Sequence, residues 1–244
     1  DVGAESTRPG AEPVAEAEEW RRLEPVLCGL SGLATPLCVD TTKFEVARRA
    51  LENGAAAIND ISGLREDPRL AELAAESDAG LVLMHMRGTP RTMQTDTRYD
   101  DLIGDVREFL GRALERAVRA GCRPDQVALD PGVGFGKSTA GNLELLARID
   151  AFAALGRPIM VGPSRKTFIG RLLGLPTDER VEGTIGACVM ALERGAHIFR
   201  VHDVRAVRRA LEIAYRIREA MSVEGEPEAD GTMVTTGQPE TPRA

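Results

Sequence analysis

Polar residues of the kinds that bind substrates follow most of the short apolar runs in this sequence. They stand at or just past the end of each run, where packing alone does not call for them. They are Asp1, Asp40, Asn59, Asp60, His85, Asp130, Ser164, Arg165, Lys166, Arg200 and His202. Any one of them could be only a helix cap or an Asx turn. Because nearly every run shows the pattern, we interpret these residues as parts of one site.

Two loops among these runs carry glycines or cations that could contact an anion. Residues 130–137 read DPGVGFGK, which contains GxGxG but has neither the spacing of a phosphate loop nor the third glycine of a dinucleotide-binding turn. Arg165 and Lys166 follow an apolar run and precede an amphipathic stretch at 168–173. They could bind an anion or be solvated loop charges. Neither loop alone identifies a ligand.

The elements that must position these residues alternate along the chain. Apolar runs predict strands at 36–40, 56–60, 80–86, 126–131, 158–163 and 196–202, and residues 1–3 predict the end of another. Helical spacing predicts helices near 15–30 and at 101–121, 142–155, 179–193 and 203–221. This alternation implies a parallel sheet covered by helices. Seven strands fit either a doubly wound sheet or a (β/α)8 barrel that lacks one βα unit.

Composition bounds the class of protein. The chain has 244 residues, 43% of them hydrophobic and 28% charged, which is enough apolar material for a core and excludes a wholly disordered chain. The net charge of −7 disfavours a broad nucleic-acid-binding surface, and no apolar run approaches the length of a membrane span. The four cysteines form no CxxC pair, which argues against a zinc site and favours a reducing cytoplasm.

The chain divides into two predicted parts. Residues 222–244 contain three Pro, three Gly, five acidic residues and no aromatic residue, and we expect this acidic tail to be disordered. Residues 1–221 are expected to form one domain. Its last helix should carry an apolar stripe made of Val207, Leu211, Ala214, Ile217 and Met221.

Several segments, taken together and in order, resemble the dihydropteroate synthases, a family of pterin-binding barrels. They are DVGAESTRPGA (1–11), VDTTK (39–43), NDISG (59–63), LMHMRGTPRTMQ (83–94), DPGVGFGK (130–137), VGPSRKTFIG (161–170), GT (183–184) and RVHDV (200–204). The resemblance implies a (β/α)8 TIM barrel over residues 1–221. It also implies that the first strand and its loop are missing from this chain.

The resemblance implies a transferase of folate biosynthesis. Such an enzyme joins 6-hydroxymethyl-7,8-dihydropterin pyrophosphate to 4-aminobenzoate, gives 7,8-dihydropteroate and pyrophosphate, and is a target of sulfonamides. The family's reaction loses pyrophosphate with the help of Mg²⁺ before the amine attacks. The resemblance further implies a cytoplasmic homodimer built from outer helices, with small-molecule substrates and neither nucleic acid nor membrane as a partner.

The same resemblance assigns roles to residues. Asp130 and Asn59 would bind the pterin edge, since a carboxylate accepts strong paired hydrogen bonds and an amide both donates and accepts. Asp40 and Lys166 would contact the pterin, and Arg200 and His202 would anchor the pyrophosphate. The catalytic set would be Asp40, Lys166, Arg200 and His202. The aminobenzoate pocket would include Thr7, Arg8, Pro9, Phe135, Lys166 and Thr167.

Departures from the family lead to further expectations. The Asn that helps to hold Mg²⁺ belongs to the missing first strand, so no metal-binding residue is assigned and we expect this chain to be weak or inactive. Ala4 stands where the family usually has Gly, and its Cβ could restrict a backbone with positive φ. Thr167 replaces a Ser and keeps the hydroxyl. His85, His197, Trp20 and Tyr99 are given no catalytic role.

Two other functions compete with the synthase. One is a non-catalytic pterin-binding homologue that keeps the pocket without turnover. The other is a methyltetrahydrofolate-binding methyltransferase on the same barrel, which residues 164–166 and 200–204 disfavour, because that reaction needs no pyrophosphate anchor.

Overall fold

Parallel strands alternate with helices through the computed structural model, which describes residues 1–223. The strands are β1 (Val2–Gly3), β2 (Leu37–Asp40), β3 (Ala55–Asp60), β4 (Gly80–Met84), β5 (Val127–Asp130), β6 (Met160–Val161) and β7 (Ile198–Phe199). The α-helices are α1 (Glu16–Leu30), α2 (Phe44–Glu52), α3 (Arg69–Glu76), α4 (Leu102–Arg119), α5 (Thr139–Ala147), α6 (Thr167–Leu173), α7 (Val181–Glu193) and α8 (Val204–Val223). The short 3-10 helices of this part of the chain are η1 (Pro124–Gln126), η2 (Ile149–Leu155) and η3 (Thr177–Glu179).

The strands neighbour one another in the order in which the chain makes them. β1 to β5 form one parallel sheet, β6 and β7 form a second, and an isolated bridge from Leu129 to Ile159 joins the two. A doubly wound sheet would reverse this order at a switch point, whereas a barrel keeps it. The strand order therefore favours a barrel over a doubly wound sheet, a choice that the apolar periodicity of the sequence leaves open.

Apolar faces of the strands and helices build one main core. Val39, Ile58, Leu83 and Leu129 are fully buried on the strands. On α4 the buried side chains recur at helical spacing: Ile103, Val106, Leu110, Ala113 and Ala117. Asp101 caps the N-terminus of that helix, since its carboxylate accepts the Gly104 N–H at 2.9 Å. Helix α4 thus turns its apolar stripe toward the core.

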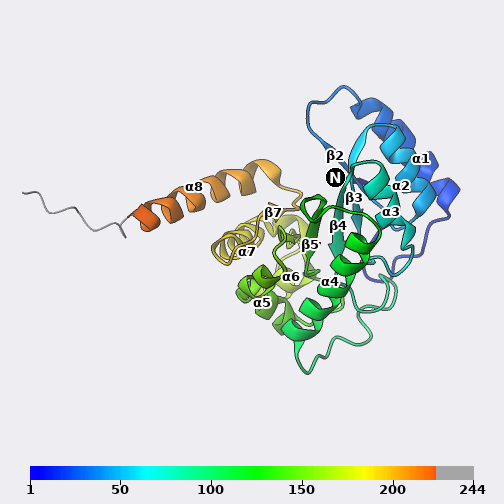
Figure 1. The fold of residues 1–244 in the computed structure, drawn as a ribbon. Coiled ribbons are helices and arrows are strands. Elements are labelled where there is room, and N and C mark those ends of the chain that lie inside the picture. The colour runs from blue at the N-terminus through cyan, green and yellow to red at the C-terminus, as the bar shows by residue number, and fades with distance from the viewer. Residues whose placement is uncertain (224–244) are drawn as a thin grey trace, which may run out of the picture.

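The helices follow one another around the strands, and α8 leaves this arrangement (Figure 1). Its first turns pack against α7, while its far end projects from the body of the protein. Of its predicted apolar stripe, only Val207 is buried, while Ile217 and Met221 are 57% and 69% exposed. No helix within residues 1–223 is long and apolar enough to cross a membrane.

Three predictions of local structure need correction. The helix predicted at 142–155 is two elements, α5 and the 3-10 helix η2, which meet at Arg148 and end at the left-handed Gly156. The predicted strands at 158–163 and 196–202 contain strands of only two residues each, with one further paired residue, Ile159, in an isolated bridge to Leu129. Ala4 is not among the non-glycine residues with positive φ, which are Leu64, Asp78 and Arg165 within the described chain, so its Cβ causes no strain.

The predicted tail at 222–244 falls largely outside the description. Helix α8 ends at Val223, two residues beyond the predicted end of the domain. The disorder predicted for residues 224–244 concerns residues outside the described part of the chain.

Candidate active site

The carboxyl ends of the central strands bring the predicted polar residues to one rim. Asp40 ends β2 and lies in register with Asn59 on β3, and Asp130 ends β5 in register with Met84 on β4. The loops after β6 and β7 supply Lys166 and Arg200. Parallel strands place such ends on the same side of the sheet, so residues far apart in sequence become neighbours.

Arg200 joins three distant parts of the chain at this rim. Its Nη2 donates to the Asp40 carboxylate at 2.9 Å, and its Nε donates to Asp1. Arg200 thereby connects the end of β7 to β1 and β2. The Asp40 side chain is only 10% exposed, and burial raises the pKa of Asp40 to about 6, although Arg200 opposes that shift.

The neighbours Asn59 and Asp60 have separate roles. The Asp60 carboxylate accepts the N–H groups of Ser62 at 2.8 Å and Leu64 at 2.6 Å, so it closes the turn after β3. Asn59 is buried, yet its Oδ1 has no hydrogen-bond partner. A buried acceptor without a partner costs about 1–3 kcal/mol, and such atoms are rare in folded proteins. Asn59 is therefore the rim residue best prepared to receive a donor from a ligand.

Asp130 is a buried carboxylate fixed from one side. One of its oxygens accepts the Gly132 N–H at 2.7 Å. Burial raises the pKa of Asp130, against the effects of that hydrogen bond and of Lys166, Lys137 and Arg200 nearby. Gly132 has φ +72°, and a Cβ there would lie 1.9 Å from the His85 carbonyl oxygen. Glycine is thus required for the turn that orients this carboxylate.

Lys166 and Phe135 form the adjoining wall of the site. The Lys166 ammonium lies 3.9 Å from the centre of the Phe135 ring, a cation–π contact. Burial lowers the pKa of Lys166 to about 8, while Asp130 and Asp40 act to raise it. Phe135 belongs to a small buried apolar cluster together with Ile61, Met84, Met86 and Met93. Sequence reasoning missed this cluster, although the LMHM run at 83–86 contains two of its members.

His202 is held by a serine of the neighbouring loop. The Ser164 Oγ lies 2.9 Å from His202 Nδ1 and accepts the His202 backbone N–H at 3.1 Å. Burial and the nearby Arg165 and Arg200 lower the pKa of His202. Arg165, which adopts a positive φ of 56°, pairs with Asp203 through two hydrogen bonds of 2.9 and 2.6 Å. Arg165 is therefore bound by protein, whereas Lys166 faces the site.

A buried lysine organises the loop between β5 and α5. Lys137 Nζ contacts His85 Nδ1 at 2.8 Å and donates to the carbonyl oxygens of Gly132 and Phe135, both at 3.0 Å. Burial lowers the pKa of Lys137 to about 7 and, together with Lys137, lowers the pKa of His85 to about 2. His85 is thus a neutral partner of Lys137. The GFGK motif contained this lysine, but its spacing gave no sign of the contact with His85.

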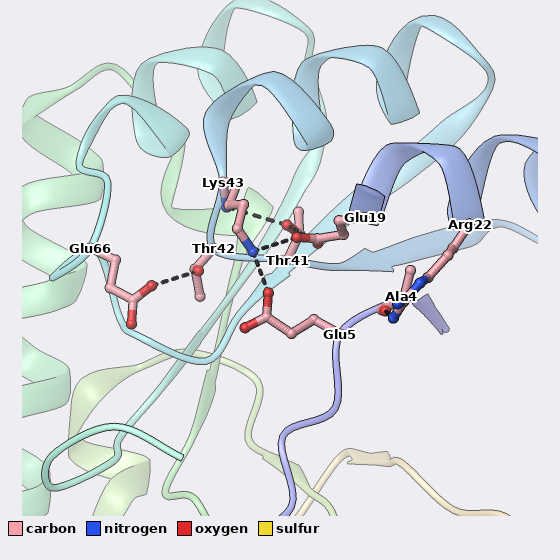
Figure 2. Close-up of polar contacts among 8 residues, drawn as sticks. All are labelled: Ala4, Glu5, Glu19, Arg22, Thr41, Thr42, Lys43 and Glu66. Atoms are coloured by element: carbon pink, nitrogen blue, oxygen red, sulfur yellow. Dashed lines mark hydrogen bonds and ion pairs between the residues drawn. The ribbon is translucent and has the colours of Figure 1, made fainter. Parts of the chain in front are cut away.

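The loop after β1 carries the predicted aminobenzoate residues Thr7, Arg8 and Pro9. Thr7 is half-buried, whereas Arg8 and Pro9 are exposed. The loop is bound at its start, where Glu5 pairs with Lys43 and Arg22 donates to the Ala4 carbonyl at 3.3 Å (Figure 2). Thr167 is exposed at the first residue of α6. None of these four residues has a described hydrogen bond to the Asp40, Asp130 or Lys166 side chains within residues 1–221.

The described residues do not form a complete metal cage. Within residues 1–223, no group of three or more His, Cys, Asp or Glu side chains is placed to hold a metal ion. Asp1 and Asp40 are two carboxylates in one site, but both are paired with Arg200. Mg²⁺ is often held by one or two carboxylates together with water and substrate phosphates. The described side chains could therefore supply at most part of the ligand shell of a Mg²⁺ ion.

Comparisons with known proteins bear on the family and the fold of this chain. Residues 1–202 match a family described as pterin binding enzymes. A dihydropteroate synthase of Synechocystis sp. is 46% identical over 216 residues, which are 88% of this chain and 75% of that protein. The structure of a Yersinia pestis dihydropteroate synthase with a sulfonamide drug has a TM-score of 0.85 at 42% identity, covering 88% of this chain and 78% of that one. A Thermus thermophilus dihydropteroate synthase in complex with 4-aminobenzoate has a TM-score of 0.82 at 46% identity, covering 88% and 82%.

Proposed function

The chain belongs to the dihydropteroate synthase family of pterin-binding enzymes, and from this membership we propose how its rim residues carry out the transfer. The reaction belongs to folate biosynthesis. It joins 6-hydroxymethyl-7,8-dihydropterin pyrophosphate to the amine of 4-aminobenzoate and releases pyrophosphate. The rim is that of a (β/α)8 barrel, where such folds build their active sites. The observation that carries the proposal is the buried, unpartnered Oδ1 of Asn59.

Asp130 and Asn59 bind the pterin ring. A pterin edge presents an exocyclic amine and ring N–H donors beside carbonyl and ring-nitrogen acceptors. The Asp130 carboxylate, oriented by Gly132, accepts two of these donors through charge-assisted hydrogen bonds. Asn59 accepts a third donor at its free Oδ1 and donates through its amide nitrogen. Binding of the pterin thus gives a hydrogen-bond partner to the Asn59 Oδ1, which the folded protein has already buried away from water.

Lys166 and Asp40, which are close enough to affect each other's pKa, would act beside the bond that breaks. Lys166 donates to the pterin carbonyl and also borders the aminobenzoate site, because its ammonium lies against Phe135. Asp40, when ionised, stabilises cationic character at the methylene carbon as pyrophosphate departs. The attacking arylamine is neutral and needs no protein base, so the protein supplies positioning and charge.

Arg200 and His202 bind the leaving pyrophosphate. The planar guanidinium suits phosphate oxygens, and 44% of the Arg200 side chain is exposed on the open side of the rim. Ser164 can donate its hydroxyl hydrogen to His202 Nδ1, which leaves the hydrogen of the neutral ring on Nε2. That nitrogen then donates to a phosphate oxygen without a change of protonation.

Thr7, Arg8 and Pro9 close the aminobenzoate side, opposite Phe135, Lys166 and Thr167. Arg8 is the cation for the carboxylate of the aminobenzoate, since it is exposed and its described hydrogen bonds use only its backbone. Because the structure of the Yersinia pestis relative contains a sulfonamide drug, we propose that this protein also binds sulfonamides, in the pocket assigned here to aminobenzoate.

Mg²⁺ is proposed as the cofactor on family grounds. When bound, it would neutralise pyrophosphate charge and would be held mainly by the pyrophosphate and water, because the Asp1 and Asp40 carboxylates are already paired with Arg200. A homodimer is proposed on the exposed apolar side chains of α8, among them Tyr215, Ile217 and Met221.

The proposal is tested by measuring pyrophosphate release with aminobenzoate omitted and then added. We expect dihydropteroate, identified by mass spectrometry, to form only when both substrates are present, at a rate above that of a protein-free control. Binding of dihydropterin pyrophosphate in a calorimeter without any aminobenzoate-dependent product would instead favour a non-catalytic pterin-binding homologue.

A further inference from the structure

A buried carboxylate lies behind the loop that carries Thr7, Arg8 and Pro9. Glu19, on the inner face of α1, is fully buried. It accepts the Thr41 hydroxyl at 2.6 Å and pairs with the Lys43 ammonium (Figure 2). A buried carboxylate is tolerated only when it is paired and hydrogen-bonded in this way. Glu19 therefore fixes the position of Lys43.

Lys43 in turn holds a second carboxylate, that of Glu5. The Lys43 and Glu5 side chains are 24% and 25% exposed, so their contact is partly shielded from water. Burial alone would lower the pKa of Lys43, but its hydrogen bonds to Glu19 and Glu5 raise the pKa above the ordinary value. The ammonium remains charged and bridges α1 to the loop after β1.

Lysine is rare in this protein, and its positions are informative. The chain contains 31 Lys and Arg residues, and only Lys43, Lys137 and Lys166 are Lys. Lys137 and Lys166 both lie in the candidate active site. A compact ammonium with three freely directed hydrogens suits a site where two carboxylates and little space surround the cation. Lys43 meets this requirement, because it lies between the carboxylates of Glu19 and Glu5.

The loop itself is bound at its two ends by unlike contacts. Glu5 at its start is held by the shielded Lys43. At its other end, the Gly10 N–H donates to the Pro90 carbonyl at 3.2 Å, and Glu12 and Arg91 form a 3.4 Å pair that is 72% and 65% exposed. Exposed pairs of that kind contribute little. Between the ends, the described hydrogen bonds of residues 6–9 stay within the loop, as between Arg8 N–H and Ser6 Oγ.

We propose that Glu5 is a positioning residue for the aminobenzoate side of the site. It acts through Lys43 and the buried Glu19 to fix the start of the loop, and so the placement of Thr7, Arg8 and Pro9. The pterin side is held by other elements, namely the ends of β3 and β5. The inference rests on the proposed function, because it assigns the loop to the second substrate.

The test compares Glu5→Ala with Glu12→Ala, a matched change at the weakly held end of the same loop. In Glu5→Ala we expect the KM for aminobenzoate to rise roughly tenfold, since a partly buried charge-assisted contact is lost. The KM for dihydropterin pyrophosphate and the Tm should stay close to those of the unchanged protein. Glu5→Gln keeps an acceptor for Lys43 and should recover part of the loss. Glu12→Ala should change either KM by less than about twofold.

Hydrogen exchange of residues 4–11 gives a readout that needs no substrate. We expect faster exchange across this loop in Glu5→Ala and unchanged exchange in Glu12→Ala. Faster exchange in a protein without synthase activity would count against the proposed function and leave the Glu5 contact supported. Unchanged exchange, or equal rises in the KM values of both substrates, would overturn the positioning role.

Discussion

At the scale of a single residue, the proposed chemistry and the burial of Asp40 favour opposite charge states of its carboxyl group. The proposed mechanism requires the negative charge of Asp40 beside the methylene carbon, while the fold buries the side chain, which is only 10% exposed. Burial raises the pKa of Asp40 from 3.8 to about 6, even with the Arg200 guanidinium 2.9 Å away. The ionised form is therefore available at neutral pH, but the folded state would be more stable if this group were uncharged.

The pH dependence of stability should reveal this conflict. Because the folded-state pKa of Asp40 lies above its ordinary value, its contribution to stability is present below about pH 4 and is lost as the pH rises through 6. A shift of two units corresponds to about 3 kcal/mol as an upper value. Asp40→Asn should therefore gain unfolding free energy relative to the unchanged protein between pH 4 and pH 8, as measured by urea denaturation.

The same substitution should lower kcat/KM roughly tenfold to a hundredfold, because charge stabilisation at the reacting carbon is lost. Asp125→Asn, at an exposed position outside the site, serves as the control for both measurements. If the difference in unfolding free energy does not change between pH 4 and pH 8, Asp40 does not titrate as the structure indicates.

The sequence predicted which residues belong to the rim better than it predicted the contacts that these residues make. The rim residues Asp40, Asn59, Asp130, Lys166 and Arg200 stood out because polar groups ended apolar runs. The pattern of apolar runs did not distinguish Asn59, with its free oxygen, from Asp60, which closes a turn; only the family resemblance singled out Asn59. That distinction depends on which backbone N–H groups lie nearby, and this is decided only by the fold.

At the scale of elements, the loop between β5 and α5 is held together by Lys137. Its ammonium gathers two carbonyl oxygens of the loop and the ring of His85 from the neighbouring strand end. The loop in turn carries Phe135, against which Lys166 packs. A glycine-rich segment of this kind has many alternative conformations in the absence of such a contact.

Removing that ammonium should loosen the loop and weaken the wall of the site. Lys137→Met keeps the length of the side chain but leaves buried carbonyl groups unpaired, so we expect a loss of about 2–4 kcal/mol of unfolding free energy. Scanning calorimetry measures the loss, with Glu144→Gln on the exposed side of α5 as the control. A Tm equal to that of the control would show that water replaces Lys137 at no cost.

The elements that sequence reasoning described least well are those with few residues to form a pattern. The predicted helix at 142–155 divides at Arg148 because the chain passes from α-helical to 3-10 geometry while the apolar spacing continues. The two-residue strands β6 and β7 lie inside longer apolar runs. Pairing with a neighbouring strand, rather than hydrophobicity, sets where such strands end.

At the scale of the whole molecule, α8 presents apolar side chains that the described chain does not cover. Ile213, Ile217 and Met221 are each more than half exposed. A groove at the base of the helix is lined by Leu192, Phe199, Val201, Leu211 and Tyr215, among others. An apolar surface of this kind is typical of an interface, which supports the proposed homodimer.

The dimer can be tested without touching the site. Ile217→Glu should place a charge in the centre of the interface and convert a dimer to a monomer in sedimentation equilibrium, while Arg205→Glu on the same helix should leave the mass unchanged. A monomeric mass for the unchanged protein, over the micromolar range, would contradict the proposal.

The ion pairs of Arg200 have a consequence for how this protein comes into being. They connect residues 199 and 160 positions apart in the chain, so they are among the least local contacts that it makes. Contacts of this kind form late, because a long stretch of chain must first be ordered. During synthesis, Asp1 and Asp40 leave the ribosome long before Arg200 does, and β2 must wait with an unneutralised carboxylate. The end of the site that we propose to bind pyrophosphate is thus the last to form. A nascent chain stopped before β7 would contain the proposed pterin-binding residues but lack Arg200, the proposed pyrophosphate anchor.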